Sequence, residues 1–195
     1  MRVIGITGGV GSGKSRVLAY IEEHFLAIVC QADHVAWELQ KPGTACYNQI
    51  VDAFGKGVLY PDGSIDRSKL GQIAFGDAEK LQQLNKIVHP AVKSAILEFI
   101  AAEAEKGTEI FVLEAALLLE AEYQNVCDEL WYVYTDEKVR RQRLKKHRQY
   151  SDEKIDAIMR NQLSEVSFRE QCQVVIDNSG DFSDTCNQIE HAMKV

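Results

Sequence analysis

The chain has 195 residues, of which 46% are hydrophobic and 26% are charged, and its formal net charge is −7 at pH 7. This length suits one α/β core with smaller insertions, and the composition is that of a folded globular protein rather than a disordered one. The excess of acidic residues argues against a broad basic surface. We therefore expect neither nucleic acid nor an anionic membrane as a partner.

The five cysteines are widely spaced and include no Cys-x-x-Cys pair, which predicts neither a structural zinc site nor a disulfide framework. The N-terminus has no apolar signal core before a cleavage site, and no run approaches the ~18 apolar residues of a membrane span. We therefore expect a reducing, cytoplasmic location. The sequence leaves the oligomeric state open.

The first motif, Gly8-Gly9-Val10-Gly11-Ser12-Gly13-Lys14-Ser15, fits the phosphate-loop (P-loop) pattern Gly-x-x-x-x-Gly-Lys-Ser/Thr at every fixed position. An apolar run at residues 2–7 precedes it and a helix-like cluster at 17–21 follows, which favours strand, loop and helix over a chance glycine-rich turn. The glycines let backbone N–H groups and the helix N-terminus point at phosphate. Lys14 would reach the β and γ phosphates, and Ser15 would bind the bridging magnesium ion.

A second short strand is predicted at residues 26–30, and it leads into Gln31-Ala32-Asp33-His34. The carboxyl end of such a strand is where ligands bind in open α/β sheets. Asp33 could orient or deprotonate an acceptor hydroxyl, or it could cap the helix predicted at residues 35–39. The residues alone do not decide between these two roles.

Strands are missing from residues 44–107, where the pattern is helical and predicts an inserted substrate domain. Helices are expected at residues 45–54, 68–75 and 78–106. His89-Pro90 interrupts the last of them, which predicts a kink or two helices.

Three further strands are predicted at residues 109–113, 130–134 and 173–177. Five strands separated mostly by helices predict a parallel sheet covered on both faces. Glu114 follows the third strand, where it could contact magnesium or simply be a polar residue at a strand end.

The densest basic cluster comes between the fourth and fifth strands: Arg140, Arg141, Arg143, Lys145, Lys146, His147 and Arg148. Guanidinium groups can stabilise a phosphoryl group in transfer, whereas the alternative is a solvated basic helix face. The helical spacing favours a mixed arrangement, with Arg140 and Arg143 facing a nucleotide and Arg141 and Lys145 facing water.

The whole chain resembles bacterial dephospho-CoA kinases. The stretches that carry the resemblance are residues 4–15, 31–33, 41–43, 54–55, 62–67, 89–90, 117–120 and 175–178. The resemblance implies a three-layer P-loop NTPase core with a five-stranded parallel sheet, a helical insertion that binds the coenzyme, and a helical lid. It places the core at 1–43, 108–137 and 163–195, the coenzyme domain at 44–107, and the lid at 138–162.

The reaction implied by the resemblance is ATP-dependent phosphorylation of the ribose 3′-hydroxyl of dephospho-CoA, which gives CoA and ADP with Mg2+ as the metal. Asp33 matches the acid that faces the acceptor hydroxyl, and the loop residues 8–15 with Arg16 match the nucleotide contacts. Asp66, Arg67 and His89 fall in stretches associated with the coenzyme.

The lid pattern Arg-Leu-x-x-Arg of that family is altered here, because His147 stands where the second arginine is expected and Arg148 follows one position late. Histidine is mostly neutral near pH 7 at its usual pKa of about 6.5. We therefore expect Arg143 and Arg148 to be the catalytic lid contacts.

Two other functions are compatible with a P-loop. One is a different small-molecule or nucleotide kinase of the same fold, since fold does not fix the substrate. The other is a GTPase-type regulatory module. It is disfavoured because Asn85-Lys86-Ile87-Val88 lacks the aspartate of a guanine-reading loop, and Asp52-Ala53-Phe54-Gly55 lies in a predicted helix.

Overall fold

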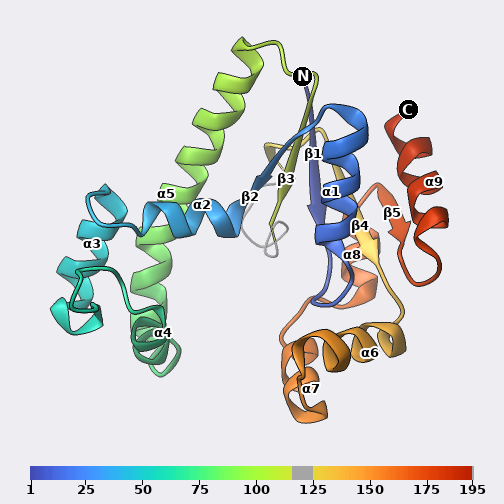
Figure 1. Ribbon diagram of the computed structural model, residues 1–195. Coiled ribbons are helices and arrows are strands. Elements are labelled where there is room, and N and C mark those ends of the chain that lie inside the picture. Colours follow the sequence, from blue (N-terminus) through green and yellow to red (C-terminus); the bar gives the residue numbers. More distant parts are fainter. Residues whose placement is uncertain (116–124, 195) are drawn as a thin grey trace. The chain divides into compact units, whose positions relative to one another are not determined.

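The computed structural model describes residues 1–115 and 125–194, and this part of the chain forms two compact units. Unit 1 comprises Met1–Cys30 and the chain from Glu103 onward, and unit 2 comprises Gln31–Ala102. Unit 1 contains nearly the whole sheet, whereas unit 2 is helical (Figure 1). The finer three-part division expected from the sequence stays a prediction.

The sheet consists of five parallel strands, as predicted. They are β1 (Arg2–Thr7), β2 (Ile28–Gln31), β3 (Ile110–Glu114), β4 (Glu129–Tyr134) and β5 (Val174–Asp177), in the order β2-β3-β1-β4-β5. β1 lies in the centre and pairs in parallel with β3 on one side and β4 on the other. The P-loop that follows β1 therefore begins in the middle of the carboxyl edge of the sheet.

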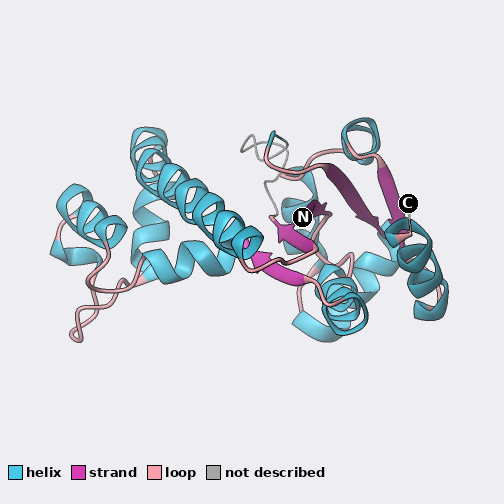
Figure 2. Cartoon of the chain, turned by 90° about the horizontal axis from the view of Figure 1, so that it is seen from above, coloured by secondary structure: helices cyan, strands magenta, loops and turns pink. Residues whose placement is uncertain are grey.

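Helices cover both faces of the sheet, which gives the three layers expected. The helices of unit 1 are α1 (Lys14–Phe25), α6 (Glu137–Arg148), α7 (Asp152–Arg160), α8 (Glu165–Gln171) and α9 (Phe182–Met193). On one face Trp131 and Val133 pack in a buried cluster with residues of β1, α1 and α9. Tyr132 points to the other face because side chains alternate along a strand, and its ring stacks on Phe168 of α8 at 4.6 Å. Figure 2 shows helices on either side of the strands.

The sequence of β1 explains why the loop has a rigid support. Ile4 and Ile6 are completely buried and Val3 is nearly so. Burial of each such side chain stabilises the fold by about 1.5–3 kcal/mol relative to exposure. Figure 1 shows α6 and α7 near the carboxyl edge of the strands, the edge from which the P-loop leaves β1.

Unit 2 is built from α2 (Ala32–Leu39), α3 (Ala45–Phe54), the 3-10 helix η1 (Lys56–Val58), α4 (Arg67–Phe75) and most of α5 (Ala78–Glu105). Its buried core joins Ile50 of α3, Val58 of η1 and Leu70 of α4. The core has no strand in it, as the sequence predicts for this region. Among the described residues, none of the helices combines the length and the apolar character that a membrane crossing needs.

Of the two outcomes predicted at His89-Pro90, that of two separate helices is wrong, because α5 runs unbroken through Pro90, and a kink stays a prediction. A proline inside a helix removes one N–H bond and costs about 3 kcal/mol. Val88 and Ala91, one on each side of the proline, both pack against the core of unit 2. We attribute the continuity of the helix to this packing, which offsets the local cost.

Candidate active site

The P-loop has the backbone form that a phosphate site needs. Gly11 and Gly13 have φ angles of 81° and 88°, a region that side-chain-bearing residues rarely adopt. A Cβ atom on Gly13 would also collide with the side-chain amide of Asn178. α1 begins at the next residue, Lys14, and its N-cap residue, Gly13, has no side chain that could cap it. Its first N–H groups are thus directed into the loop, where an anion is favoured.

The carbonyl oxygen of Ser12 anchors the loop to the rest of unit 1. It accepts hydrogen bonds from Asn178 Nδ2 at 2.7 Å, Thr135 Oγ1 at 2.9 Å and Arg143 Nη1 at 3.4 Å. Asn178 follows β5, Thr135 follows β4, and Arg143 lies on α6. Donors from three separate elements therefore meet on one backbone atom.

Asn178 is itself held firmly, because it is buried and bonded on several sides. Its Oδ1 accepts from Thr185 Oγ1 at 3.1 Å, and its backbone oxygen accepts from Arg143 Nη2 at 2.8 Å. Neither Asn178 nor Thr135 was among the site residues chosen from the sequence. Their position in the sequence could have identified them as site residues, because each directly follows a strand at the carboxyl edge of the sheet.

Lys14 and Glu114 lie together beside the loop. Lys14 Nζ donates to the carbonyl oxygen of Gly8 at 2.7 Å and lies 3.7 Å from Glu114 Oε1. Glu114 ends β3 opposite Ile6 of β1. Ser15 is exposed in the first turn of α1. An ammonium, a hydroxyl and a carboxylate around a glycine loop match what a magnesium-bound polyphosphate requires.

The basic residues of α6 divide as their spacing predicts. Arg140 and Arg143 hydrogen-bond to the P-loop backbone, at Val10 and Ser12. On the other side of the helix, Arg141 bonds to Glu137 and Asp156, and Lys145 bonds to Asp152. Arg141 and Lys145 therefore bond to acidic residues, whereas the spacing predicted that they would face water.

The two loop-facing arginines differ electrostatically from Arg141. Burial lowers the pKa of Arg140, and burial together with the nearby charge of Arg16 lowers the pKa of Arg143. Hydrogen bonds to Glu137 and Asp156 instead raise the pKa of Arg141. Within residues 1–115 and 125–194, neither Arg140 nor Arg143 forms an ion pair with a carboxylate. Both cations are therefore partly desolvated beside a loop shaped for an anion.

Among the hydrogen bonds of the described residues, none joins the side chain of Arg16, His147 or Arg148 to the P-loop. The guanidinium of Arg16 stacks 3.7 Å from the ring centre of Phe182, at the start of α9. His147 and Arg148 are both exposed in the last turn of α6, which is helical through Arg148. A hydrogen bond from Arg148 lowers the pKa of Tyr150. The lid role of Arg148 stays a prediction.

Asp33 is not a helix cap. α2 begins at Ala32, with Gln31 in the capping position, so Asp33 already lies in the first helical turn. The helix starts earlier than the sequence suggested because it follows β2 without an intervening loop. The Asp33 side chain is exposed, and its charge is favourably placed near the positive end of the helix dipole.

The remaining predicted residues lie in unit 2. Asp66 is buried and caps α4, with Oδ1 accepting from the backbone N–H groups of Ser68 and Lys69, each at 3.1 Å. Arg67 is exposed at the start of α4, and His89 is exposed on α5. A coenzyme contact for any of these three stays a prediction. The family-like stretch 117–120 lies outside the described residues.

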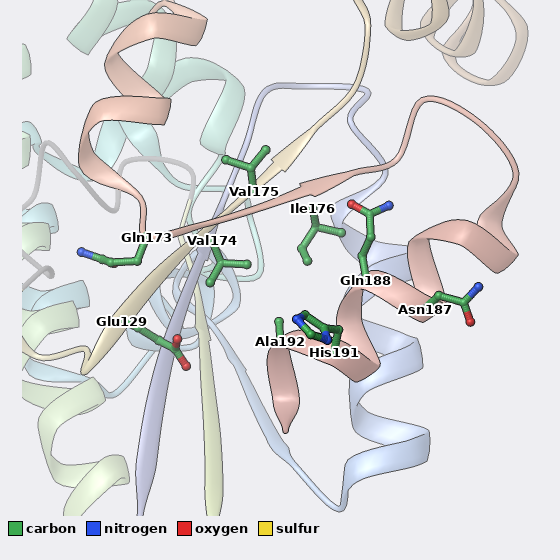
Figure 3. Close-up of a pocket in the computed structure, with 9 residues that line it drawn as sticks. All are labelled: Glu129, Gln173, Val174, Val175, Ile176, Asn187, Gln188, His191 and Ala192. Carbon is green, nitrogen blue, oxygen red and sulfur yellow. The ribbon is translucent and has the colours of Figure 1, made fainter. Parts of the chain in front are cut away.

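A cavity of about 550 Å³ lies between β5 and α9 (Figure 3). Val174, Ile176 and Gln188 are among the side chains that line it, and none of the P-loop residues do. This cavity therefore does not coincide with the P-loop, whereas a smaller one of about 280 Å³ is lined by Thr135, Arg140 and Gln162.

Comparison with known proteins shows which family the chain belongs to. The model of a family described as dephospho-CoA kinase matches residues 2–184. The chain is also 40% identical over 187 residues to a dephospho-CoA kinase of Carboxydothermus hydrogenoformans, covering 96% of this chain and 90% of the relative. The chain belongs to the dephospho-CoA kinase family.

Solved structures of other proteins have the same fold as this chain. A crystal structure of a Thermus thermophilus protein superposes with a TM-score of 0.84 at 25% identity, covering 99% of this chain and 96% of the other. A dephospho-CoA kinase from Campylobacter jejuni gives a TM-score of 0.75 at 22% identity, covering 100% and 96%. Dephospho-CoA kinases are phosphotransferases with an alcohol acceptor, and membership of the family implies that ATP is used.

The cap of α4 gives a prediction about stability. Asp66→Ala removes the acceptor of two N–H groups and should lower the melting temperature by roughly 2–4 °C, the effect of one lost cap in a chain of this size. Asp66→Asn should melt close to wild type, because asparagine caps equally well. Backbone hydrogen bonding lowers the pKa of Asp66, so its contribution is present at neutral pH and is lost as the pH falls below its ordinary value of 3.8.

Differential scanning calorimetry measures both effects, and Asp52→Ala, at an exposed position of α3, is the matched control. If Asp66→Asn melts like wild type but raises the Michaelis constant for dephospho-CoA, Asp66 contacts the coenzyme as well. If Asp66→Ala leaves the melting temperature unchanged, the cap is not important for stability.

Proposed function

We propose that this chain transfers the γ-phosphoryl group of ATP to the ribose 3′-hydroxyl of dephospho-CoA, producing CoA and ADP. The observation that carries the proposal is the anchored P-loop, with Lys14 and two loop-facing arginines beside it, in a chain of the dephospho-CoA kinase family. Such a site acts by positioning and by electrostatic stabilisation, because phosphoryl transfer needs little covalent help from the protein.

The P-loop and its neighbours hold the phosphate groups. The backbone N–H groups of residues 8–15 cradle them, Lys14 exchanges its bond to Gly8 for phosphate oxygens, and Arg143 adds a guanidinium from α6. A bound Mg2+ ion would supply positive charge that offsets the charge of the phosphate groups. Ser15 would hold that ion through its hydroxyl, and Glu114 would do so directly or through water.

Asp33 orients the acceptor and takes its proton. Its exposed carboxylate stands in the first turn of α2, directly after the carboxyl end of β2, and it does not cap the helix. Unit 2 binds the coenzyme, with Arg67 and His89 exposed for contact. The segment 138–162, which contains most of α6 and α7, is the lid.

The acceptor can be tested directly. With ATP and magnesium, the purified protein should release ADP faster with dephospho-CoA than with adenosine, shikimate or nucleoside monophosphates in a coupled assay. Phosphorus NMR should place the new phosphate on the ribose 3′ oxygen. Faster turnover of another acceptor would assign the chain a different substrate within the same fold.

Replacement of Asp33 tests the acceptor side of the mechanism. Asp33→Asn keeps the size and removes the charge, and kcat should fall on the order of 10²- to 10⁴-fold if Asp33 is the general base. Glu38→Gln is the matched control, because Glu38 lies on the same helix and pairs with Lys41. An Asp33→Asn enzyme with the kcat of wild type would remove Asp33 from the mechanism.

A further inference from the structure

The P-loop face of α6 carries three basic positions in a row. Arg140, Arg143 and His147 are spaced three and then four residues apart, which places them on one side of a helix. Arg148 follows five residues after Arg143 and so points away from that side. If a second guanidinium from α6 meets the phosphates, Arg140 is better placed than Arg148.

Arg140 lies directly on the first half of the P-loop. Its Nε donates to the carbonyl oxygen of Val10 at 3.0 Å, and a Cβ atom on Gly9 would collide with its guanidinium group. The guanidinium group of Arg140 can lie against the loop here because Gly9 has no side chain. Arg148 has no comparable contact with the loop among the hydrogen bonds of the described residues.

Gln162, in the turn after α7, orients the guanidinium group of Arg140 through a hydrogen bond. Its Oε1 accepts from Arg140 Nη2 at 2.7 Å and from the backbone N–H of Val10 at 3.3 Å. One neutral oxygen is therefore shared by a P-loop N–H group and an arginine. A phosphate oxygen offers the same acceptor with a negative charge, which strengthens both bonds.

The position of Lys14 indicates which phosphate group would lie beside Arg140. The lysine of a P-loop reaches the β and γ phosphates, and here its ammonium group lies 2.7 Å from the carbonyl oxygen of Gly8. Arg140 contacts Val10, which lies two residues after Gly8 in the P-loop. Arg143 instead contacts Ser12 and Asn178, beside the start of α1. The two arginines would therefore flank different ends of a triphosphate bound in the loop.

We propose that Arg140 is the second phosphate-contacting arginine of α6, that it acts at the γ-phosphoryl group, and that Gln162 positions it. This inference rests on the proposed kinase function and names a residue that the altered lid pattern left unassigned. Because charge spreads over the γ oxygens during transfer, the contact strengthens in the transition state. Burial lowers the pKa of Arg140, as expected for a cation held ready for an anion without a carboxylate partner.

Steady-state kinetics test Arg140 against its neighbours. Arg140→Ala should lower kcat on the order of 10²-fold, as when one transition-state donor is removed, with a smaller change in the Michaelis constant for ATP. His147→Ala and Arg148→Ala should each change kcat much less. Lys146→Ala is the charge-matched control, because Lys146 is exposed on the same helix. A normal kcat for Arg140→Ala, with a large loss for Arg148→Ala or His147→Ala, would overturn the assignment.

A double-mutant cycle tests Gln162 as a positioning residue. Gln162→Met keeps the length and removes the acceptor, and it should lower kcat in the wild-type background. In the Arg140→Ala background it should change kcat little, because its effect passes through Arg140. Equal losses in both backgrounds would show that Gln162 acts independently and would reject the positioning role.

Nucleotide binding separates this inference from the proposed function. In calorimetric titrations without an acceptor, Arg140→Ala should weaken ATP binding more than ADP binding, since ADP lacks the γ phosphate. An equal loss for both nucleotides would place Arg140 elsewhere on the polyphosphate. This result is informative even if wild type fails to phosphorylate dephospho-CoA, which would reject the proposed substrate alone.

Discussion

The carbonyl oxygen of Ser12 is the point on which the phosphate site depends. Three side chains from beyond the P-loop donate to it, and they come from the ends of β4 and β5 and from α6. Each such bond contributes only about 1 kcal/mol net, but leaving a buried amide such as Asn178 unsatisfied costs about 1–3 kcal/mol. The loop is therefore held in its curved form by tertiary structure, and its N–H groups need not be reorganised when phosphate binds.

The charges of unit 1 complement this geometry. The chain is acidic overall, with a net charge of −7, so attraction of a nucleotide must come from local cations. Acids at Glu137, Asp152 and Asp156 pair with Arg141 and Lys145 on the outer side of α6. Arg140 and Arg143 are left facing the P-loop without a carboxylate in the described structure. The same helix thus separates cations that stabilise the fold from cations that are available to phosphate.

The parts of this structure with local causes could be predicted from the sequence. The β1 strand, the P-loop and α1 follow from a hydrophobic run, a glycine pattern and helical periodicity within residues 2–25. The parallel sheet and the division of charges along α6 were also predictable. By contrast, Ser12 and Asn178 are 166 residues apart, and no local pattern joins them. Pro90 lies inside a single helix, which we attribute to the packing of its neighbours, and the start of α2 at Ala32 excludes the capping role of Asp33 that the residues alone left open.

The central claim, that donors to Ser12 make the loop ready for phosphate, is tested most directly by the ATP affinity of Asn178→Ala. Isothermal titration calorimetry should show a dissociation constant raised on the order of 10-fold, equivalent to about 1.4 kcal/mol. Gln188→Ala should bind ATP like wild type, because within the described part of the chain the Gln188 side chain hydrogen-bonds to Asp177 and Asp184 and not to the P-loop. A folded Asn178→Ala protein that binds ATP as tightly as wild type would contradict the account.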